Sequence, residues 1–237
     1  MLNTKKYAVL CLFLSALVLL CAFGLSRMGS SIAVWQENDP TAPIFVIDAG
    51  HGREDGGATD SMGRKESEIN LEISLRLQDF LRLIGVKTRM IREEDVSVET
   101  EGNTIAARKV SDIRNRVRMV EETPNARLIS IHQNFYPEGK YRGAQVFYSN
   151  TTGSQLWAES LQELLTVQVD PKNHRECKPA RDIYLLDHVH CPAILVECGF
   201  LSNTEEASLL REASYQKKLA AAIACCAINN LEAENEI

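Results

Sequence analysis

The sequence of 237 residues has no low-complexity tract, no internal repeat and no excess of basic residues. Nothing therefore suggests a disordered chain, and a content of 45% hydrophobic and 24% charged residues suits one globular core. The formal net charge of -6 argues against a nucleic-acid-binding protein. A local basic run is the exception, and we interpret it as the solvated face of a helix: Arg108, Lys109, Arg114, Arg116 and Arg118.

The seven cysteines lack the spacing of a disulfide framework or of a structural zinc site. Cys11 and Cys21 lie in an apolar N-terminal segment, and the remaining five form an odd set without a CxxC pair. We expect these five to be small buried apolar residues. They are Cys177, Cys191, Cys198, Cys225 and Cys226.

The N-terminal end carries a long apolar run. Residues 7–25 contain no charged residue, follow Lys5 and Lys6, and precede Arg27. This length suits a membrane-spanning helix better than the roughly 7 to 15 apolar residues of a cleavable signal core. We therefore predict a signal anchor, with a cleaved signal peptide as the alternative, over residues 1–27, and a linker over 28–43. The body would then lie outside the cytoplasm, membrane-anchored or secreted.

From residue 44 onward, apolar runs of strand length alternate with segments of helical periodicity. We predict strands at 44–49, 86–91, 127–131, 143–149, 183–186 and 193–196, and helices at 66–84, 105–122, 153–167, 204–211 and 215–231. This alternation is typical of an α/β fold with a twisted, mostly parallel sheet and helices on both faces. We expect a single catalytic domain over residues 44–231, followed by a tail at 232–237.

Three polar residues follow the ends of predicted strands: His51, His132 and Glu197. Parallel strands bring their carboxyl ends to one edge of a sheet, where Glu66, at the start of the first helix, can join them. Two imidazoles and one carboxylate suit a catalytic zinc site because they leave a fourth position open for water, and a second carboxylate can act as general base. The residues predict amide hydrolysis with Zn2+ held by His51, Glu66 and His132, and with Glu197 as base.

Other residues compete for these roles. His188 and His190 would point both rings to one face if they lay on a strand, and could bind a metal there, although their polar surroundings favour a surface or rim position. Cys198, beside Glu197, invites comparison with Cys/His hydrolases. Since neighbouring residues of a strand face opposite sides, we expect Cys198 to face the core when Glu197 faces the cleft.

Four separated motifs, in order, resemble the type 3 family of zinc-dependent N-acetylmuramoyl-L-alanine amidases. These enzymes cleave the amide bond between muramic acid and the peptide stem of peptidoglycan. The motifs are IDAGHGREDGGA, KESEINL, ARLISIHQN and AILVECGFLSN. The resemblance implies that His51, Glu66 and His132 hold zinc and that Glu197 is catalytic.

Two further stretches, RGAQVFYS at 142–149 and IYLL at 183–186, resemble the spore-cortex, germination-specific members of that family. This likeness implies cleavage of peptidoglycan during cortex maturation, before muramic-δ-lactam forms, and makes the forespore envelope a candidate location. The alternatives are a vegetative cell-wall amidase, an anchored peptidoglycan-binding module with weak activity, and a zinc peptidase of soluble peptides. The body holds no wall-binding repeat, so targeting would come from the anchor, the sheet-edge groove or a helper protein.

The chain departs from the family pattern at Arg53, where members usually carry a further glycine. Arg53 is either a charged loop tip or a substrate contact that engages a carboxylate of the stem peptide. As a fixed positive charge near the metal it would also oppose zinc binding. Asn134, just past His132, is a second candidate for substrate contact, or else a cap or turn residue.

Overall fold

The computed structural model of the protein describes the backbone of residues 40–235 and the side chains of residues 40–231. The predicted signal segment, most of the predicted linker and the end of the predicted tail lie outside the described residues, and they stay predictions. Within the described part of the chain, no helix combines the length and the apolar character needed to cross a membrane.

In the described residues, a six-stranded sheet has the strand order β2-β1-β3-β6-β4-β5. Paired neighbours are parallel, except that β4 runs antiparallel to β6. This confirms the mostly parallel sheet predicted from the sequence. The strands are β1 (Ile44–Ala49), β2 (Lys87–Met90), β3 (Ala126–Asn134), β4 (Gln145–Tyr148), β5 (Lys178–Pro179) and β6 (Ala193–Phe200).

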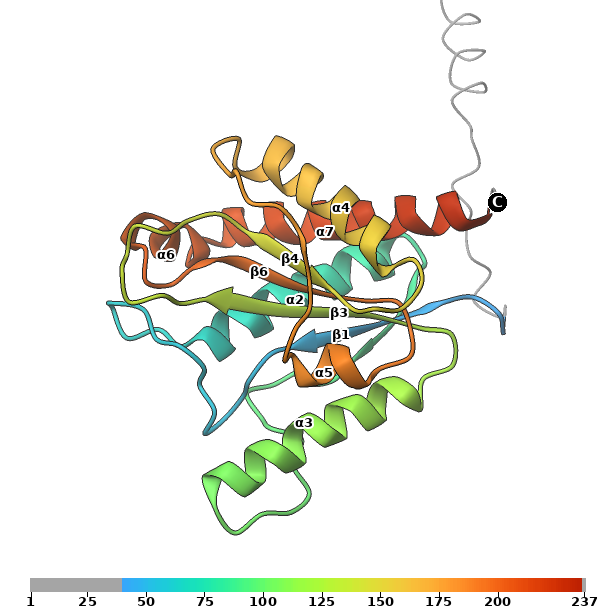
Figure 1. The fold of residues 1–237 in the computed structure, drawn as a ribbon, viewed down its shortest axis with the longest axis horizontal. Coiled ribbons are helices and arrows are strands. Elements are labelled where there is room, and N and C mark those ends of the chain that lie inside the picture. Colours follow the sequence, from blue (N-terminus) through green and yellow to red (C-terminus); the bar gives the residue numbers. More distant parts are fainter. Residues whose placement is uncertain (1–39, 236–237) are drawn as a thin grey trace, which may run out of the picture. The chain divides into compact units, whose positions relative to one another are not determined.

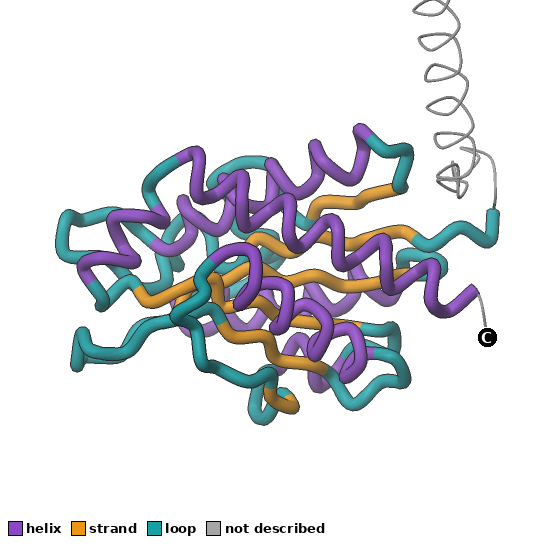
Figure 2. The backbone as a smooth tube through the Cα atoms, turned by 90° about the horizontal axis from the view of Figure 1, so that it is seen from above, coloured by secondary structure: helices purple, strands orange, loops and turns teal. Residues whose placement is uncertain are grey.

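Helices cover both faces of the sheet, as Figure 1 shows, with α2, α4 and α7 on one side and α3 and α5 on the other. The same layering is visible from above in Figure 2. It confirms the predicted architecture. The helices are α2 (Glu66–Leu83), α3 (Ile105–Glu121), α4 (Ser154–Leu164), the π-helix η1 (Leu165–Val169), α5 (Tyr184–His188), α6 (Thr204–Leu210) and α7 (Ala213–Asn235).

The strands alternate their side chains between two apolar layers, as the period of two requires. On one face Phe45 meets Trp157 of α4, with ring centroids 5.9 Å apart. On the other face Val46 belongs to a cluster that includes Val120 of α3 and Leu185 of α5. Burial on both faces explains why the strands read as continuous apolar runs.

The structure corrects the predicted strand at 183–186, because these residues lead into the short helix α5. Leu185 and Leu186 bury their side chains against the sheet from a helix, and an apolar run of this length does not reveal its own period. A second correction concerns His132 and Glu197, which lie within β3 and β6 rather than after them. Pairing of these two strands continues through the polar residues.

The cysteine prediction is partly wrong. Cys198 and Cys226 are buried as expected, but Cys177 and Cys191 are only half-buried and Cys225 is exposed on α7. The five described cysteines are all free thiols, in agreement with the absence of a disulfide framework.

Candidate metal centre and active site

His51 stands in a tight turn at the carboxyl end of β1. Its φ of 62° lies in the left-handed region, which costs a residue with a Cβ roughly 1 to 2 kcal/mol. Arg116 Nη2 donates to the carbonyl oxygen of His51 at 2.7 Å, and Arg92 donates to those of Ala49 and Gly50 at 2.8 and 3.0 Å. Two arginines therefore hold the turn in the conformation that presents the His51 ring.

Arg116 was expected on a solvated helix face, and this expectation is wrong. Its side chain is 2% exposed and forms an ion pair with Asp48, which is itself buried. Burial opposes ionisation of Asp48, yet hydrogen bonds from Arg116 and Ser130 hold the pKa of this carboxyl below its ordinary value. A carboxylate inside an apolar strand needs a buried cation, so Asp48 signals in the sequence that a cation lies inside the fold, but not which arginine supplies it.

The structure brings His51, Glu66 and His132 together at the edge of the sheet. One potential ligand atom from each lies within 4.8 Å of the others. Glu66 Oε1 lies 3.3 Å from His51 Nε2 and 3.0 Å from His132 Nδ1. The two histidines thus turn different ring nitrogens toward the same carboxylate.

Neighbouring groups fix the orientation of His51 and Glu66. His51 Nδ1 lies 3.0 Å from Asp55 Oδ2, and Asp55 in turn pairs with Lys109 Nζ at 2.7 Å. Glu66 Oε2 accepts a hydrogen bond from the backbone N–H of Ala58 at 3.0 Å. Burial disfavours protonated His51, but Asp55 and Glu66 outweigh it and raise its pKa to about 9. The same negative surroundings favour a bound cation.

Two glycines make room for the cluster. A Cβ at Gly50 would lie 2.1 Å from His132 Nε2, inside the imidazole ring. A Cβ at Gly57 would lie 2.5 Å from Glu66 Oε2 and 2.8 Å from His51 Cδ2. These approaches explain why the first motif is rich in glycine.

Glu197 lies on β6 directly opposite His132 of β3 and opposite Gln145 of β4. Its Oε2 atom is buried and has no hydrogen-bond partner among the described residues. Burial raises the pKa of Glu197 to about 7, and the negative charge of Glu66 acts in the same direction, against the opposing effect of His132. A carboxyl group with a pKa near neutrality suits a general acid and base. Cys198 is fully buried, in agreement with the expectation that it faces the core.

Arg175 was missed by the sequence reasoning. Its Nε donates to the carbonyl oxygen of Arg142 and its Nη1 to Gln145 Oε1, both at 2.8 Å. Its guanidinium carbon stands 4.5 Å from the centre of the Phe200 ring. Because Gln145 is opposite Glu197, this fixed positive charge lies beside the candidate base. The polar loop that carries Arg175 gave no periodic signal.

The other residues singled out from the sequence are not members of this cluster. Arg53 is exposed at the loop tip, where its backbone N–H donates to Asp95 Oδ1. His188 and His190 are exposed, which confirms a surface position, but they lie at the end of α5 and beyond it, not on a strand. Asn134, the last residue of β3, is half-buried.

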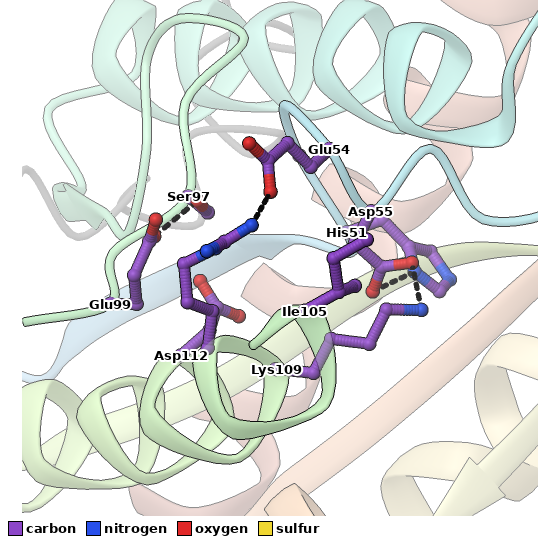
Figure 3. A pocket seen from close by; sticks show the side chains of 10 residues that line it. His51, Glu54, Asp55, Ser97, Glu99, Ile105, Lys109 and Asp112 are labelled. Carbon is purple, nitrogen blue, oxygen red and sulfur yellow. Dashed lines mark hydrogen bonds and ion pairs between the residues drawn. The ribbon is translucent and has the colours of Figure 1, made fainter. Parts of the chain in front are cut away.

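A small cavity of about 20 Å³ opens beside His51 (Figure 3). Charged side chains from α3 and from the loop after β1 meet in it. Arg108 pairs with Glu54 there, and Lys109 pairs with Asp55. This flank of the site is therefore strongly polar.

The fold is that of an amide hydrolase: the chain belongs to the N-acetylmuramoyl-L-alanine amidase family, whose sequence model matches residues 45–229. The germination-specific N-acetylmuramoyl-L-alanine amidase of Bacillus subtilis (strain 168) is 37% identical over 184 residues, which cover 76% of each protein. The family resemblance drawn from the four motifs is confirmed.

Solved structures agree with this assignment. The CwlD amidase of Clostridioides difficile, in complex with the GerS lipoprotein, matches with a TM-score of 0.78 and 36% identity over 81% of this chain and 99% of that one. The N-acetylmuramoyl-L-alanine amidase AmiC2 of Nostoc punctiforme matches with a TM-score of 0.70 and 29% identity over 80% and 97%.

Proposed function

We propose that the chain is a zinc-dependent amidase that releases peptide stems from the muramic acid of spore-cortex peptidoglycan. His51, Glu66 and His132 hold the zinc, and Glu197 is the catalytic base. The observation that carries this proposal is the meeting of two imidazole nitrogens and one carboxylate oxygen within 4.8 Å, beside the buried, unpartnered Glu197 Oε2.

The residues fit zinc by their chemistry and by the space around them. Nitrogen and carboxylate donors in a set of three match catalytic zinc sites. Gly50 and Gly57 leave the space that lets the ligands converge. When bound, zinc supplies a Lewis acid that polarises the amide carbonyl and acidifies water.

The chain's own groups carry the proton transfers. Glu197 accepts a proton from the attacking water and donates it to the leaving amine of L-alanine, which its pKa near 7 allows in both directions. Asp55 holds His51 through Nδ1, so that Nε2 faces Glu66. Arg175, held by Gln145, adds a positive charge where negative charge develops in the transition state.

The relatives support a proposal for the place and the partners of the reaction. The likeness to the germination-specific amidase supports a role in the spore cortex. The CwlD structure contains a lipoprotein, which supports a helper protein for this chain as well. The predicted signal anchor at 1–27, linker at 28–43, catalytic domain at 44–231 and tail at 232–237 complete this proposal, with the catalytic domain outside the cytoplasm.

The test is mass analysis of muropeptides after cortex-type peptidoglycan is incubated with zinc-loaded protein. We expect free stems that begin with L-alanine and muramic acid without a stem. Glu197→Gln should lose the activity, by about 100-fold or more, while its zinc content stays the same. Stem release by Glu197→Gln at the wild-type rate would refute the role of Glu197. Cleavage of soluble peptides without a glycan would instead indicate a peptidase.

Arg53 and Asn134 stay proposed substrate contacts. Arg53 carries a positive φ of 53°, so Arg53→Gly relieves backbone strain as well as removing charge. The matched variant Arg53→Gln removes the charge alone. If Arg53 weakens zinc binding by its charge, both variants bind zinc more tightly; unchanged zinc affinity in Arg53→Gln removes this idea.

A further inference from the structure

Three of the four exposed aromatic side chains of the described residues lie in one loop. Phe135, Tyr136 and Tyr141 are 48%, 47% and 37% exposed, and they belong to the segment that connects β3 to β4. The fourth, Tyr184, lies on α5 and stacks on His188. Aromatic rings gathered on an exposed loop mark a contact surface more often than scattered apolar residues do.

The rings of this loop pack on one another and on the end of β6. The centroids of Tyr136 and Tyr141 are 4.8 Å apart in an edge-to-face arrangement, and Tyr141 lies 6.3 Å from Phe200 with a tilt of 30°. We name Tyr136, Tyr141 and Phe200 the aromatic platform. It has an exposed part, made of the two tyrosines, and a buried base, made of Phe200.

Hydrogen bonds hold the loop in place. The backbone N–H of Tyr136 donates to Ser202 Oγ at 3.1 Å, and Asn203 Nδ2 donates to the carbonyl oxygen of Gly139 at 3.0 Å. A Cβ at Gly139 would lie 2.7 Å from the carbonyl oxygen of Ser202, so the loop approaches this segment closely. The platform is therefore built before any ligand arrives.

A register shift between β3 and β6 places the base of the platform on the same face of the sheet as Glu197. His132 pairs with Glu197 and Asn134 pairs with Phe200, so two residues of β3 match three residues of β6. Residues two apart on a strand share a face, and Phe200 thus lies on the face of Glu197. Three residues of extended chain span about 10 Å, which places the platform about one or two sugar rings from the reacting bond.

The two flanks of the site differ in chemistry. The cavity beside His51 is lined by four acidic and two basic side chains, and the two basic ones, Arg108 and Lys109, are paired there with Glu54 and Asp55. The platform on the β3 and β6 side presents rings. The substrate has the same division, because a peptide stem carries charged groups, whereas the C–H faces of sugar rings pack on aromatic rings.

We propose that the aromatic platform binds the glycan strand of peptidoglycan, so that the stem extends toward the charged side chains on the His51 flank of the site. This inference rests on the proposed function for its substrate class. Tyr136 and Tyr141 contact the sugars, and Phe200 supports Tyr141 from below. The platform sets the direction in which the amide bond enters the site.

The probe is glycan strands freed of stems by an unrelated amidase, with zinc-loaded full-length protein. Tyr136→Leu and Tyr141→Leu keep an apolar side chain but remove the flat ring, and each should raise the Kd for these strands about tenfold. Tyr136→Phe should bind as wild type does, because the ring and not the hydroxyl makes the contact. Tyr184→Leu is the matched control on a distant helix and should leave the Kd unchanged.

Activity on intact sacculi gives a second measurement. The two leucine variants should raise KM with little change in kcat and should keep their zinc content, because the platform lies beyond the reacting atoms. Wild-type affinity for stem-free strands in both leucine variants would overturn the proposal and would favour a protein-binding role for the exposed rings. An equal loss in Tyr184→Leu overturns it too.

Binding of stem-free strands requires no turnover, so the two proposals fail separately. If the protein binds these strands through its tyrosines but releases no stems, the proposed role of the platform stands and the proposed reaction is refuted. If the protein releases stems equally well with leucine at both positions, the proposed reaction stands and the proposed role of the platform is refuted.

Discussion

The guanidinium of Arg116 reaches from α3 to the carbonyl oxygen of His51, 2.7 Å away, and at the same time pairs with Asp48 inside the sheet. One buried side chain thus links the strand, the helix and the left-handed residue that presents its ring to Glu66. Arg92 likewise donates to the carbonyl oxygen of Gly50, the residue before His51. The backbone of the turn is held by cations rather than by its own hydrogen bonds alone.

Removal of Arg116 should destabilise the fold and loosen the site. In Arg116→Met, Asp48 keeps a buried charge without its partner, which costs about 3 to 5 kcal/mol of the free energy of unfolding. The double variant Arg116→Met with Asp48→Asn should recover part of this loss. Urea unfolding measures both. A single variant as stable as the wild type would show that the pair contributes nothing.

Gly50→Ala should separate metal binding from folding. The added Cβ would overlap the ring of His132, so the imidazole must move and zinc affinity should fall at least tenfold. Gly56→Ala is the matched control, because its Cβ meets only the flexible side chain of Lys65. Chelator competition measures zinc affinity, and circular dichroism checks the fold. Equal affinity in the two variants would contradict the close approach to His132.

Cys198 should prove inert despite its place beside Glu197. Its thiol is fully buried, and burial raises its pKa well above the ordinary value, so little reactive thiolate forms at neutral pH. Under native conditions iodoacetamide should label the exposed Cys225 and spare Cys198, as peptide mass mapping would show. Cys198→Ala should keep its amidase activity. Loss of activity in this variant with its zinc retained would favour a cysteine hydrolase.

The ion pair of Asp60 with Arg211 should make stability depend on pH. Burial opposes ionisation of Asp60, but Arg211 Nε, at 2.7 Å, and two backbone N–H groups lower its pKa below the ordinary 3.8. A carboxyl group whose pKa is lowered in the folded state stabilises the fold at pH values above its unfolded-state pKa. This stabilisation is lost as the pH falls from the unfolded-state pKa through the folded-state pKa. The stability difference between wild type and Asp60→Asn should therefore be largest near neutrality and should shrink below pH 3.8. Urea midpoints measured across this range test it; a constant difference would exclude the linkage.

Local periodicity was enough to predict most of the fold. The strand at 44–49 matches β1, and the helices at 66–84 and 105–122 match α2 and α3 to within a residue. Their apolar spacing is set by burial against the sheet, which a short window of sequence records. The run at 183–186 was too short to carry such a record, and α5 was mistaken for a strand.

The site residues could be predicted from the sequence, but the arginines that position them could not. His51, His132 and Glu197 come at the ends of apolar runs, and sheet topology gathers such positions. Arg116 and Arg175 act across 65 and 30 residues of chain, on the carbonyl oxygen of His51 and on Gln145. No local pattern distinguishes an arginine that turns inward from its solvated neighbours.

If the aromatic platform binds glycan as proposed, the register shift between β3 and β6 makes the number of residues between Glu197 and Phe200 a determinant of specificity. A change of one residue in this stretch reverses the face on which every later side chain of a strand lies. An insertion or deletion between Glu197 and Phe200 would thus turn the ring away from the site while His51, Glu66 and His132 stayed in place. Relatives that share all three metal ligands can therefore differ in the glycan strands that they bind, through the number of residues in this stretch alone.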